Sequence, residues 1–239
     1  MTISALAKLP DTGAPDLLFV LLHGVGASAA HMASLAQALA TEYPQAAVLC
    51  IDAPDPFDGV PGGGAGYQWF SVRGVTETNR PERVAATLPR FIAQVRELQT
   101  RFALDWQRTA LAGFSQGAIV ALEAVQAEPH LAGRVLAFSG RHATAPMNAP
   151  IDTTVHIFHG LDDRVMPHAA IVDSAERLLA LGGDVTADVL PGIGHELHPK
   201  LVAKAIEQLR SFLPKKLWRE VLAEAPLLPR VASSDELGD

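Results

Sequence analysis

The chain has 239 residues, of which 49% are hydrophobic and 19% charged, a balance that suits one α/β domain and excludes a disordered chain. Its net charge of −7 argues against nucleic acid or an anionic membrane surface as the main partner. The longest uninterrupted aliphatic or aromatic run, Leu17–Leu22, is far too short for a spanning helix, and no basic cluster precedes it as in a signal peptide. We therefore expect a cytoplasmic protein with no integral membrane association.

Strand-like and helix-like segments alternate along the chain. Helical spacing, with apolar residues three or four positions apart, occurs in 82–104, 168–181 and 201–212. Pro89, inside the first of these, marks either a kink or the true start of that helix. Apolar segments typical of buried strands occur at Leu17–Leu22, Ala46–Ile51, Thr109–Phe114, Arg134–Ser139, Thr153–Phe158 and Asp184–Leu190.

This alternation predicts an α/β fold with a doubly wound, mostly parallel sheet and helices on both faces. The ligand site of such a sheet lies at the carboxyl ends of its strands. The loop between Ser139 and Thr153 is too short for a folded insert, so we expect no separate cap domain. Residues 54–66 are rich in proline and glycine, which predicts a loop. This loop either lines the active site or serves only as a flexible connector.

The domain organisation that follows is simple. Residues 1–213 form a single domain, and residues 214–239 form a C-terminal extension. In that extension Leu217, Val221 and Leu222 predict a short packed helix, followed by a polar, acidic tail that frays. The single cysteine, Cys50, excludes an internal disulfide and lies in an apolar run, which favours a buried thiol over a reactive one.

A serine follows the third strand-like segment in a setting typical of a nucleophile. Residues 113–117 read Gly-Phe-Ser-Gln-Gly, between the apolar run Thr109–Phe114 and the apolar, helix-like run Ala118–Val125. At such a strand-to-helix junction Ser115 lies on a sharp turn, with its hydroxyl exposed at the carboxyl edge of the sheet. The two glycines are required because the tight turn leaves no room for side chains.

A serine hydroxyl is a poor nucleophile at neutral pH, so Ser115 needs a base, and the base needs an orienting acid. In this setting both follow the serine in the order acid, then histidine, on loops after later strands. Asp162 and Asp163 follow the fifth predicted strand, and His195 follows the sixth. His195 is therefore the candidate base, and at this point either aspartate could be the acid.

The other histidines fit structural roles better. His198 lies one turn past His195 and is expected to cap the following helix. A zinc pair on a helix needs a spacing of four positions rather than three, so no metal site is expected. His159 and His23 stand at strand ends, where we expect them to order their loops.

Several motifs carry a resemblance to a known family. The chain resembles the α/β-hydrolases of the phospholipase/carboxylesterase group, which includes acyl-protein thioesterases and small bacterial carboxylesterases. The resemblance covers about residues 17–213. Its motifs occur in order, as Leu22-His23-Gly24-Val25-Gly26, the serine pentapeptide, His159–Pro167 and Gly194-His195-Glu196, with Tyr67–Phe70 similar to the family's Trp-Phe segment.

The resemblance implies a role for each matched position. Ser115 matches the nucleophile and His195 the base. Asp163 matches the acid, because the family places that carboxylate three residues after the His-Gly pair. Asp162 then becomes a solvent-facing turn residue.

An ester carbonyl under attack develops negative charge, which needs preorganised donors. The N–H of Gln116 follows the nucleophile at a helix start, and the resemblance adds the N–H of Val25. Because both donors are main-chain groups, the two side chains are expected to be free to vary. Trp69, Phe70 and Met166 are candidates for substrate binding in the acyl pocket, although such residues are often simply core.

Residues and resemblance together predict a serine esterase that cleaves short- to medium-chain carboxylic esters, or related thioesters, through an acyl-enzyme and without a cofactor. A small-molecule ester is the expected partner, and a homodimer is left open. A histidine base predicts that kcat/KM rises with pH through about 6–7.5. Alternatives are an acyl-protein thioesterase or lysophospholipase, a relative of dienelactone hydrolase, and an inactive binding protein. Arg164 departs from the family pattern and is a candidate for contact with a substrate carboxylate.

Overall fold

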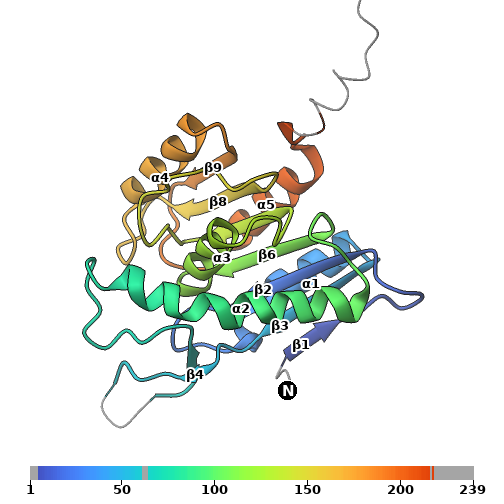
Figure 1. The fold of residues 1–239 in the computed structure, drawn as a ribbon, viewed down its shortest axis with the longest axis horizontal. Coiled ribbons are helices and arrows are strands. Elements are labelled where there is room, and N and C mark those ends of the chain that lie inside the picture. Colours follow the sequence, from blue (N-terminus) through green and yellow to red (C-terminus); the bar gives the residue numbers. More distant parts are fainter. Residues whose placement is uncertain (1–4, 61–63, 216, 218–239) are drawn as a thin grey trace, which may run out of the picture.

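The structure is a computed structural model that describes residues 5–60, 64–215 and 217 (Figure 1). Its centre is a seven-stranded sheet in which the first strand is antiparallel to its neighbour and all other pairs are parallel. In spatial order the strands are β1 (Ala5–Lys8), β3 (Ala46–Ile51), β2 (Leu17–Leu22), β6 (Thr109–Phe114), β7 (Arg134–Phe138), β8 (Thr154–Gly160) and β9 (Asp184–Leu190).

Helices cover both faces of this sheet. The helices α2 (Arg80–Phe102), α3 (Gln116–Ala127) and α4 (His168–Ala180) pack on one face, and α1 (Ala33–Glu42) and α5 (Pro199–Ser211) on the other. Figure 1 shows α2 and α3 in front of the sheet and α1 behind it. A short 3₁₀ helix, Ala29–Met32, precedes α1. The doubly wound, mostly parallel sheet predicted from the sequence is confirmed.

The pleat of β2 explains why its sequence is apolar throughout. Leu18, Val20 and Leu22 enter the core under α2, α3 and α4, whereas Phe19 and Leu21 enter the core under α1 and α5. Successive side chains of a strand point to opposite faces, so a strand covered on both faces has no polar side.

Most predicted bounds agree with the structure, and four strands agree at both ends. β7 ends one residue early because Ser139 has a φ of 47° and leaves the strand. Pro89 lies inside α2, so the alternative that it starts the helix is wrong. The helix begins at Arg80 and has a proline in its first turn, where the missing N–H costs no hydrogen bond.

Three short strands escape the sequence patterns. β1 is an antiparallel edge strand of four residues, and β4 (Asp55–Pro56) pairs with β5 (Tyr67–Gln68) in a small hairpin. This hairpin belongs to the long loop between β3 and α2. The predicted helix and frayed tail after Pro214 fall almost wholly on residues outside the described part of the chain.

The loops after β2, β6, β7, β8 and β9 leave from one edge of the sheet, because these strands are parallel. No separate cap domain is inserted between β7 and β8, where residues 139–153 form a loop. Within the described ranges, no helix combines the length and apolar character needed to cross a membrane.

Candidate active site

Ser115 occupies a strained turn between β6 and α3. Its φ of 52° and ψ of −115° are rare for a residue with a side chain. Its N–H donates to the Phe138 carbonyl of the neighbouring strand at 2.9 Å. A Cβ atom at Gly113 would lie 2.4 Å from the Ala118 nitrogen, and one at Gly117 would lie 2.4 Å from the Leu22 oxygen. The expectation that this turn requires glycines is therefore confirmed.

Three loops bring Ser115, His195 and Asp163 into one hydrogen-bonded chain. The His195 Nε2 atom lies 2.9 Å from Ser115 Oγ, and its Nδ1 atom lies 2.7 Å from Asp163 Oδ2. The Asp163 side chain is fully buried, whereas the His195 side chain is 18% exposed. The Phe114 ring lies 5.1 Å from the imidazole and restricts it on one side. An imidazole held between a hydroxyl and a carboxylate can accept the hydroxyl proton.

Local hydrogen bonds hold the Asp163 carboxylate in its ionised form. Its Oδ1 atom accepts the N–H groups of Val165 at 2.9 Å and Met166 at 2.8 Å. Burial by itself would raise the pKa of Asp163, but the hydrogen bonds from Met166, His195 and Val165 outweigh it, and the pKa lies below its usual value. His159 lies beneath this loop and, as expected, orders it, with Nε2 2.7 Å from the Met166 carbonyl oxygen.

The other aspartate and histidines considered from the sequence, Asp162, His198 and His23, make different contacts. Asp162 is exposed and accepts the Gly192 N–H at 3.0 Å, as expected of a turn residue. His198 accepts the Lys200 N–H and caps α5, also as expected. His23 is fully buried, and its ring contacts the Gly24 carbonyl and the Ala53 N–H.

The two predicted oxyanion donors belong to segments that adjoin Ser115. Gln116 is the first residue of α3, and Val25 lies in the loop after β2. A Cβ atom added to Gly24 would lie 3.4 Å from the Ser115 Cβ, so the Val25 loop is packed directly against the serine. Within the described chain, neither N–H donates a hydrogen bond. Both are therefore available to a bound oxygen.

The side chain of Gln116 carries contacts that the sequence did not reveal. It is 3% exposed, its Oε1 accepts the Trp69 N–H at 2.7 Å, and its Nε2 donates to the Phe70 carbonyl at 2.7 Å. The expectation that this side chain is free to vary is wrong. No local pattern could have indicated these contacts, because their partners lie 46 and 47 positions away.

The three predicted substrate contacts belong largely to the hydrophobic core. Trp69 is 1% exposed and packs edge-on against Phe91, with ring centroids 5.7 Å apart. Phe70 is also buried, and Met166 is half-buried against the same cluster. This packing favours the core interpretation for Trp69, and contact of the other two with an acyl group stays a prediction.

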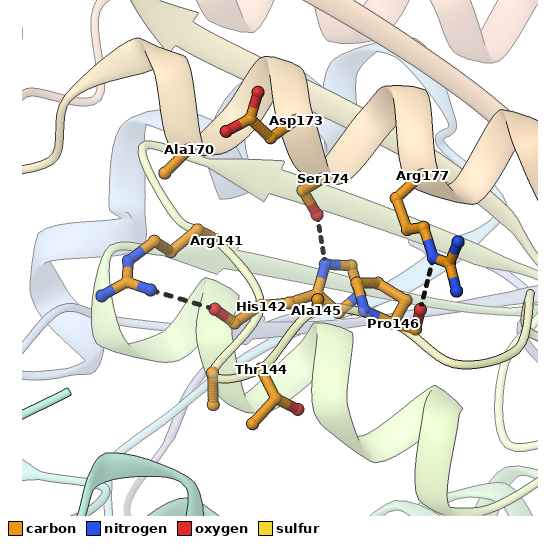
Figure 2. A pocket seen from close by; sticks show the side chains of 10 residues that line it. Arg141, His142, Thr144, Ala145, Pro146, Ala170, Asp173, Ser174 and Arg177 are labelled. Atoms are coloured by element: carbon orange, nitrogen blue, oxygen red, sulfur yellow. Dashed lines mark hydrogen bonds between the residues drawn. The ribbon is translucent and has the colours of Figure 1, made fainter. Parts of the chain in front are cut away.

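A cavity of about 220 Å³ lies between α4 and the loop after β7 (Figure 2). Within it His142 Nδ1 lies 2.6 Å from Ser174 Oγ, and burial lowers the pKa of His142 to about 4. Arg177 donates to the Pro146 carbonyl across the cavity. Sequence patterns did not single out this cavity.

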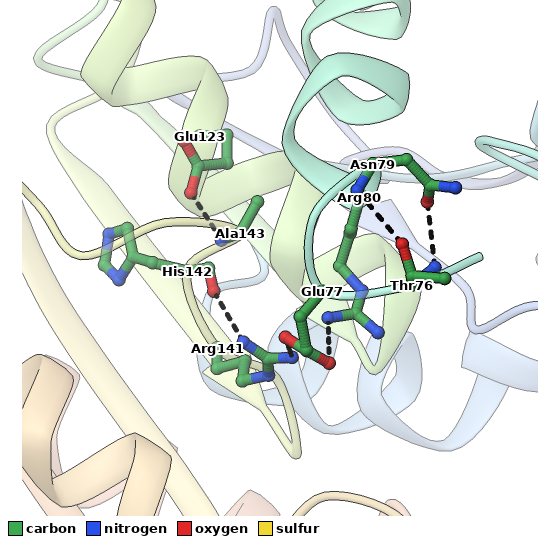
Figure 3. Close-up of polar contacts among 8 residues, drawn as sticks. All are labelled: Thr76, Glu77, Asn79, Arg80, Glu123, Arg141, His142 and Ala143. Carbon is green, nitrogen blue, oxygen red and sulfur yellow. Dashed lines mark hydrogen bonds and ion pairs between the residues drawn. The ribbon is translucent and has the colours of Figure 1, made fainter.

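An ion pair ties the loop after β7 to the start of α2 (Figure 3). Glu77 lies 2.6 Å from Arg80 and 2.5 Å from Arg141. Hydrogen bonds from Arg80 and then Arg141 lower the pKa of Glu77 to about 2. The same loop is fixed to α3, because the Ala143 N–H donates to Glu123 at 2.6 Å. The loop after β7 is thus joined both to the start of α2 and to α3.

The described residues contain no group of three histidine, cysteine, aspartate or glutamate side chains placed to hold a metal ion.

Comparison with known proteins identifies the family of this chain. The profile of the phospholipase/carboxylesterase family matches residues 11–213. The chain belongs to this family. It is 42% identical to esterase YpfH of Escherichia coli (strain K12) over 218 residues, which cover 91% of this chain and 92% of that protein. Membership confirms the predicted family and the predicted class, a carboxylic ester hydrolase.

One further relative and two solved structures are similar to this chain at lower identity. Acyl-protein thioesterase 1 of Gibberella zeae is 33% identical over 118 residues, which cover 46% of this chain and 50% of that protein. The crystal structure of esterase PE8 superposes with a TM-score of 0.80 at 27% identity, covering 89% of this chain and all of that one. A carboxylesterase from Mesorhizobium loti, at 19% identity and a TM-score of 0.70, shares the fold over 82% of this chain and 90% of its own.

Proposed function

We propose that this member of the family is a serine carboxylesterase that hydrolyses short- to medium-chain carboxylic esters through an acyl-enzyme. The observation that carries the proposal is the hydrogen-bonded chain Ser115–His195–Asp163, with distances of 2.9 and 2.7 Å. These are the distances at which a hydroxyl, its base and an orienting carboxylate act together.

The mechanism proceeds in two halves. His195 takes the proton of Ser115 as Oγ attacks the ester carbonyl, and the N–H groups of Val25 and Gln116 stabilise the resulting oxyanion. The tetrahedral intermediate collapses, His195 gives the proton to the departing alkoxide, and the acyl group stays on the serine. Water then attacks the acyl-enzyme with His195 again as base, which releases the carboxylic acid and restores Ser115.

The Asp163 carboxylate supports both halves without reaching the substrate. It fixes the tautomer in which Nδ1 carries a proton and Nε2 is free to accept the one from Ser115, and it stabilises the imidazolium that forms. The N–H groups of Val165 and Met166 keep this carboxylate ionised and oriented.

Preference for short to medium chains is supported by the surroundings of the serine. No cap domain covers the carboxyl edge of the sheet. An open edge favours short acyl groups, because a site that binds a long chain must enclose most of its surface.

The test is the initial rate of hydrolysis of p-nitrophenyl esters from acetyl to palmitoyl, measured for the wild type and Ser115→Ala. We expect activity that peaks at short chains and is abolished in the variant. Rates that rise towards palmitoyl would refute the chain-length assignment, and undiminished activity in Ser115→Ala would refute the mechanism.

Thioester or lysophospholipid hydrolysis is the second candidate. It is favoured by the similarity to acyl-protein thioesterase 1 of Gibberella zeae, which extends over about half of this chain. The same ester series distinguishes it, because this candidate predicts a preference for long acyl groups.

A further inference from the structure

The segment Tyr67–Phe70 lies against the loop that carries one proposed oxyanion donor. We call this segment the strap. The Gly26 N–H donates to the Tyr67 carbonyl at 2.8 Å, and the Tyr67 N–H donates to the Ala27 carbonyl at 2.8 Å. The Trp69 indole N–H also donates to the His23 carbonyl at 2.9 Å. These three bonds bracket Val25 on both sides and fix its loop.

The strap is also hydrogen-bonded to the side chain of the residue that carries the other donor. The Gln116 side-chain amide accepts the Trp69 N–H and donates to the Phe70 carbonyl, both at 2.7 Å. Its oxygen and nitrogen are each used once, in a side chain that is 3% exposed. A buried, bidentate amide of this kind holds its partners in one geometry, because loss of either bond leaves a buried polar group unpaired.

The strap therefore adds a hydrogen-bonded link between two segments that follow neighbouring strands, β2 and β6. Val25 follows β2, and Gln116 begins α3 after β6. Their N–H groups must converge on one oxygen at about 2.7–3.1 Å to stabilise an oxyanion. We propose that the Gln116 side chain is a positioning residue that sets, through the strap, the spacing between the Val25 and Gln116 N–H donors. This inference rests on the proposed ester hydrolysis and assigns the side chain a task distinct from that of its own backbone N–H.

A merely structural role makes a different prediction. If the amide only stabilised the fold, its loss would lower the free energy of unfolding and leave the chemistry of the folded enzyme unchanged. If it positions the donors, its loss weakens binding of the transition state more than binding of the substrate. The turnover number then falls while KM changes little.

The chain offers a matched control in Gln99. This glutamine is 6% exposed, its Nε2 atom donates to Thr109 Oγ1 at 3.0 Å and to the Leu131 carbonyl at 2.8 Å, and its Oε1 atom accepts a hydrogen bond from Arg96 at 3.2 Å. It lies near the end of α2, and none of its contacts involves the serine turn or the strap. Gln99→Met and Gln116→Met each replace a buried, hydrogen-bonded amide by an apolar side chain of similar length.

The experiment measures kcat and KM on p-nitrophenyl acetate, the inhibition constant of a trifluoromethyl ketone that forms a hemiketal oxyanion, and unfolding in urea. For Gln116→Met we expect kcat to fall by about 10- to 100-fold, part of the loss typical for removing one donor, with KM within about threefold. The inhibition constant should rise by a similar factor. For Gln99→Met we expect a comparable loss of stability and kcat within about twofold of the wild type.

Equal kcat in the two folded variants would overturn the proposal. Should Gln116→Met not fold, Trp69→Phe is the second variant, because it removes the indole N–H that ties the strap to His23 and keeps a buried aromatic ring at this position. This variant should lower kcat and raise the inhibition constant of the ketone in parallel. Wild-type values for both quantities would equally overturn the proposal. Failure of the proposed serine mechanism would show separately, because activity would then survive in Ser115→Ala.

Discussion

Replacing Asp163 by asparagine tests the orientation of the imidazole with little change in shape. The new side chain can keep its oxygen on the N–H groups of Val165 and Met166, which now bind Asp163 Oδ1 at 2.9 and 2.8 Å. Its amide nitrogen then replaces Oδ2, 2.7 Å from His195 Nδ1. An amide N–H donates where the carboxylate accepted, so the imidazole is held with Nδ1 unprotonated and a proton on Nε2.

This tautomer cannot accept the proton of Ser115, whose Oγ lies 2.9 Å from Nε2. Loss of the correct tautomer in a serine triad costs roughly 10⁴-fold in kcat, equivalent to about 5.5 kcal/mol at about 1.36 kcal/mol per factor of ten. We expect a loss of this size for Asp163→Asn with KM nearly unchanged, because the buried carboxylate does not reach the substrate.

The assay is steady-state hydrolysis of p-nitrophenyl acetate, with circular dichroism to establish that the variant is folded. Asp162→Asn is the matched control, since Asp162 is exposed and its only side-chain hydrogen bond within the described chain is to the Gly192 N–H. It should retain kcat within about twofold. A loss below tenfold in Asp163→Asn, or a larger loss in Asp162→Asn, would refute the reasoning.

Three further predictions concern other groups. Burial lowers the pKa of His142 to about 4 and that of His156 to about 3, so unfolding takes up protons below about pH 6.5 and stability falls towards pH 4. His156→Gln should reduce the slope of unfolding free energy against pH by about 1.4 kcal/mol per unit, and an unchanged slope would contradict this. Burial raises the pKa of Cys50 to about 12, so a thiol reagent should modify it only in denaturant. Arg164→Ala should selectively slow the hydrolysis of esters that carry a carboxylate. An equal loss of rate on neutral esters would exclude contact between Arg164 and a substrate carboxylate.

The central strands were predictable because they are covered on both faces. Leu17–Leu22 and Ala46–Ile51 are apolar throughout, and both become parallel strands with the predicted bounds. The edge strand Ala5–Lys8 was not predictable, since four residues paired on one side carry no distinct pattern. Asp55–Pro56 and Tyr67–Gln68 are shorter still.

The candidate site was predictable where chemistry dictates residue type and chain order. Ser115, Asp163 and His195 follow β6, β8 and β9, and a parallel sheet brings the carboxyl ends of its strands to one edge. The Gln116 contacts and the His142–Ser174 pair were not predictable. They join segments 32 or more positions apart through groups whose residue types have many other uses.

The most direct test of the central claim is labelling with a serine-directed fluorophosphonate, followed by peptide mass spectrometry. An activated nucleophile at Ser115 predicts one adduct on the peptide that contains residues 113–117, slower labelling in His195→Ala, and no adduct in Ser115→Ala. Labelling that persists in Ser115→Ala, or an unreactive wild type that is folded, would contradict the account.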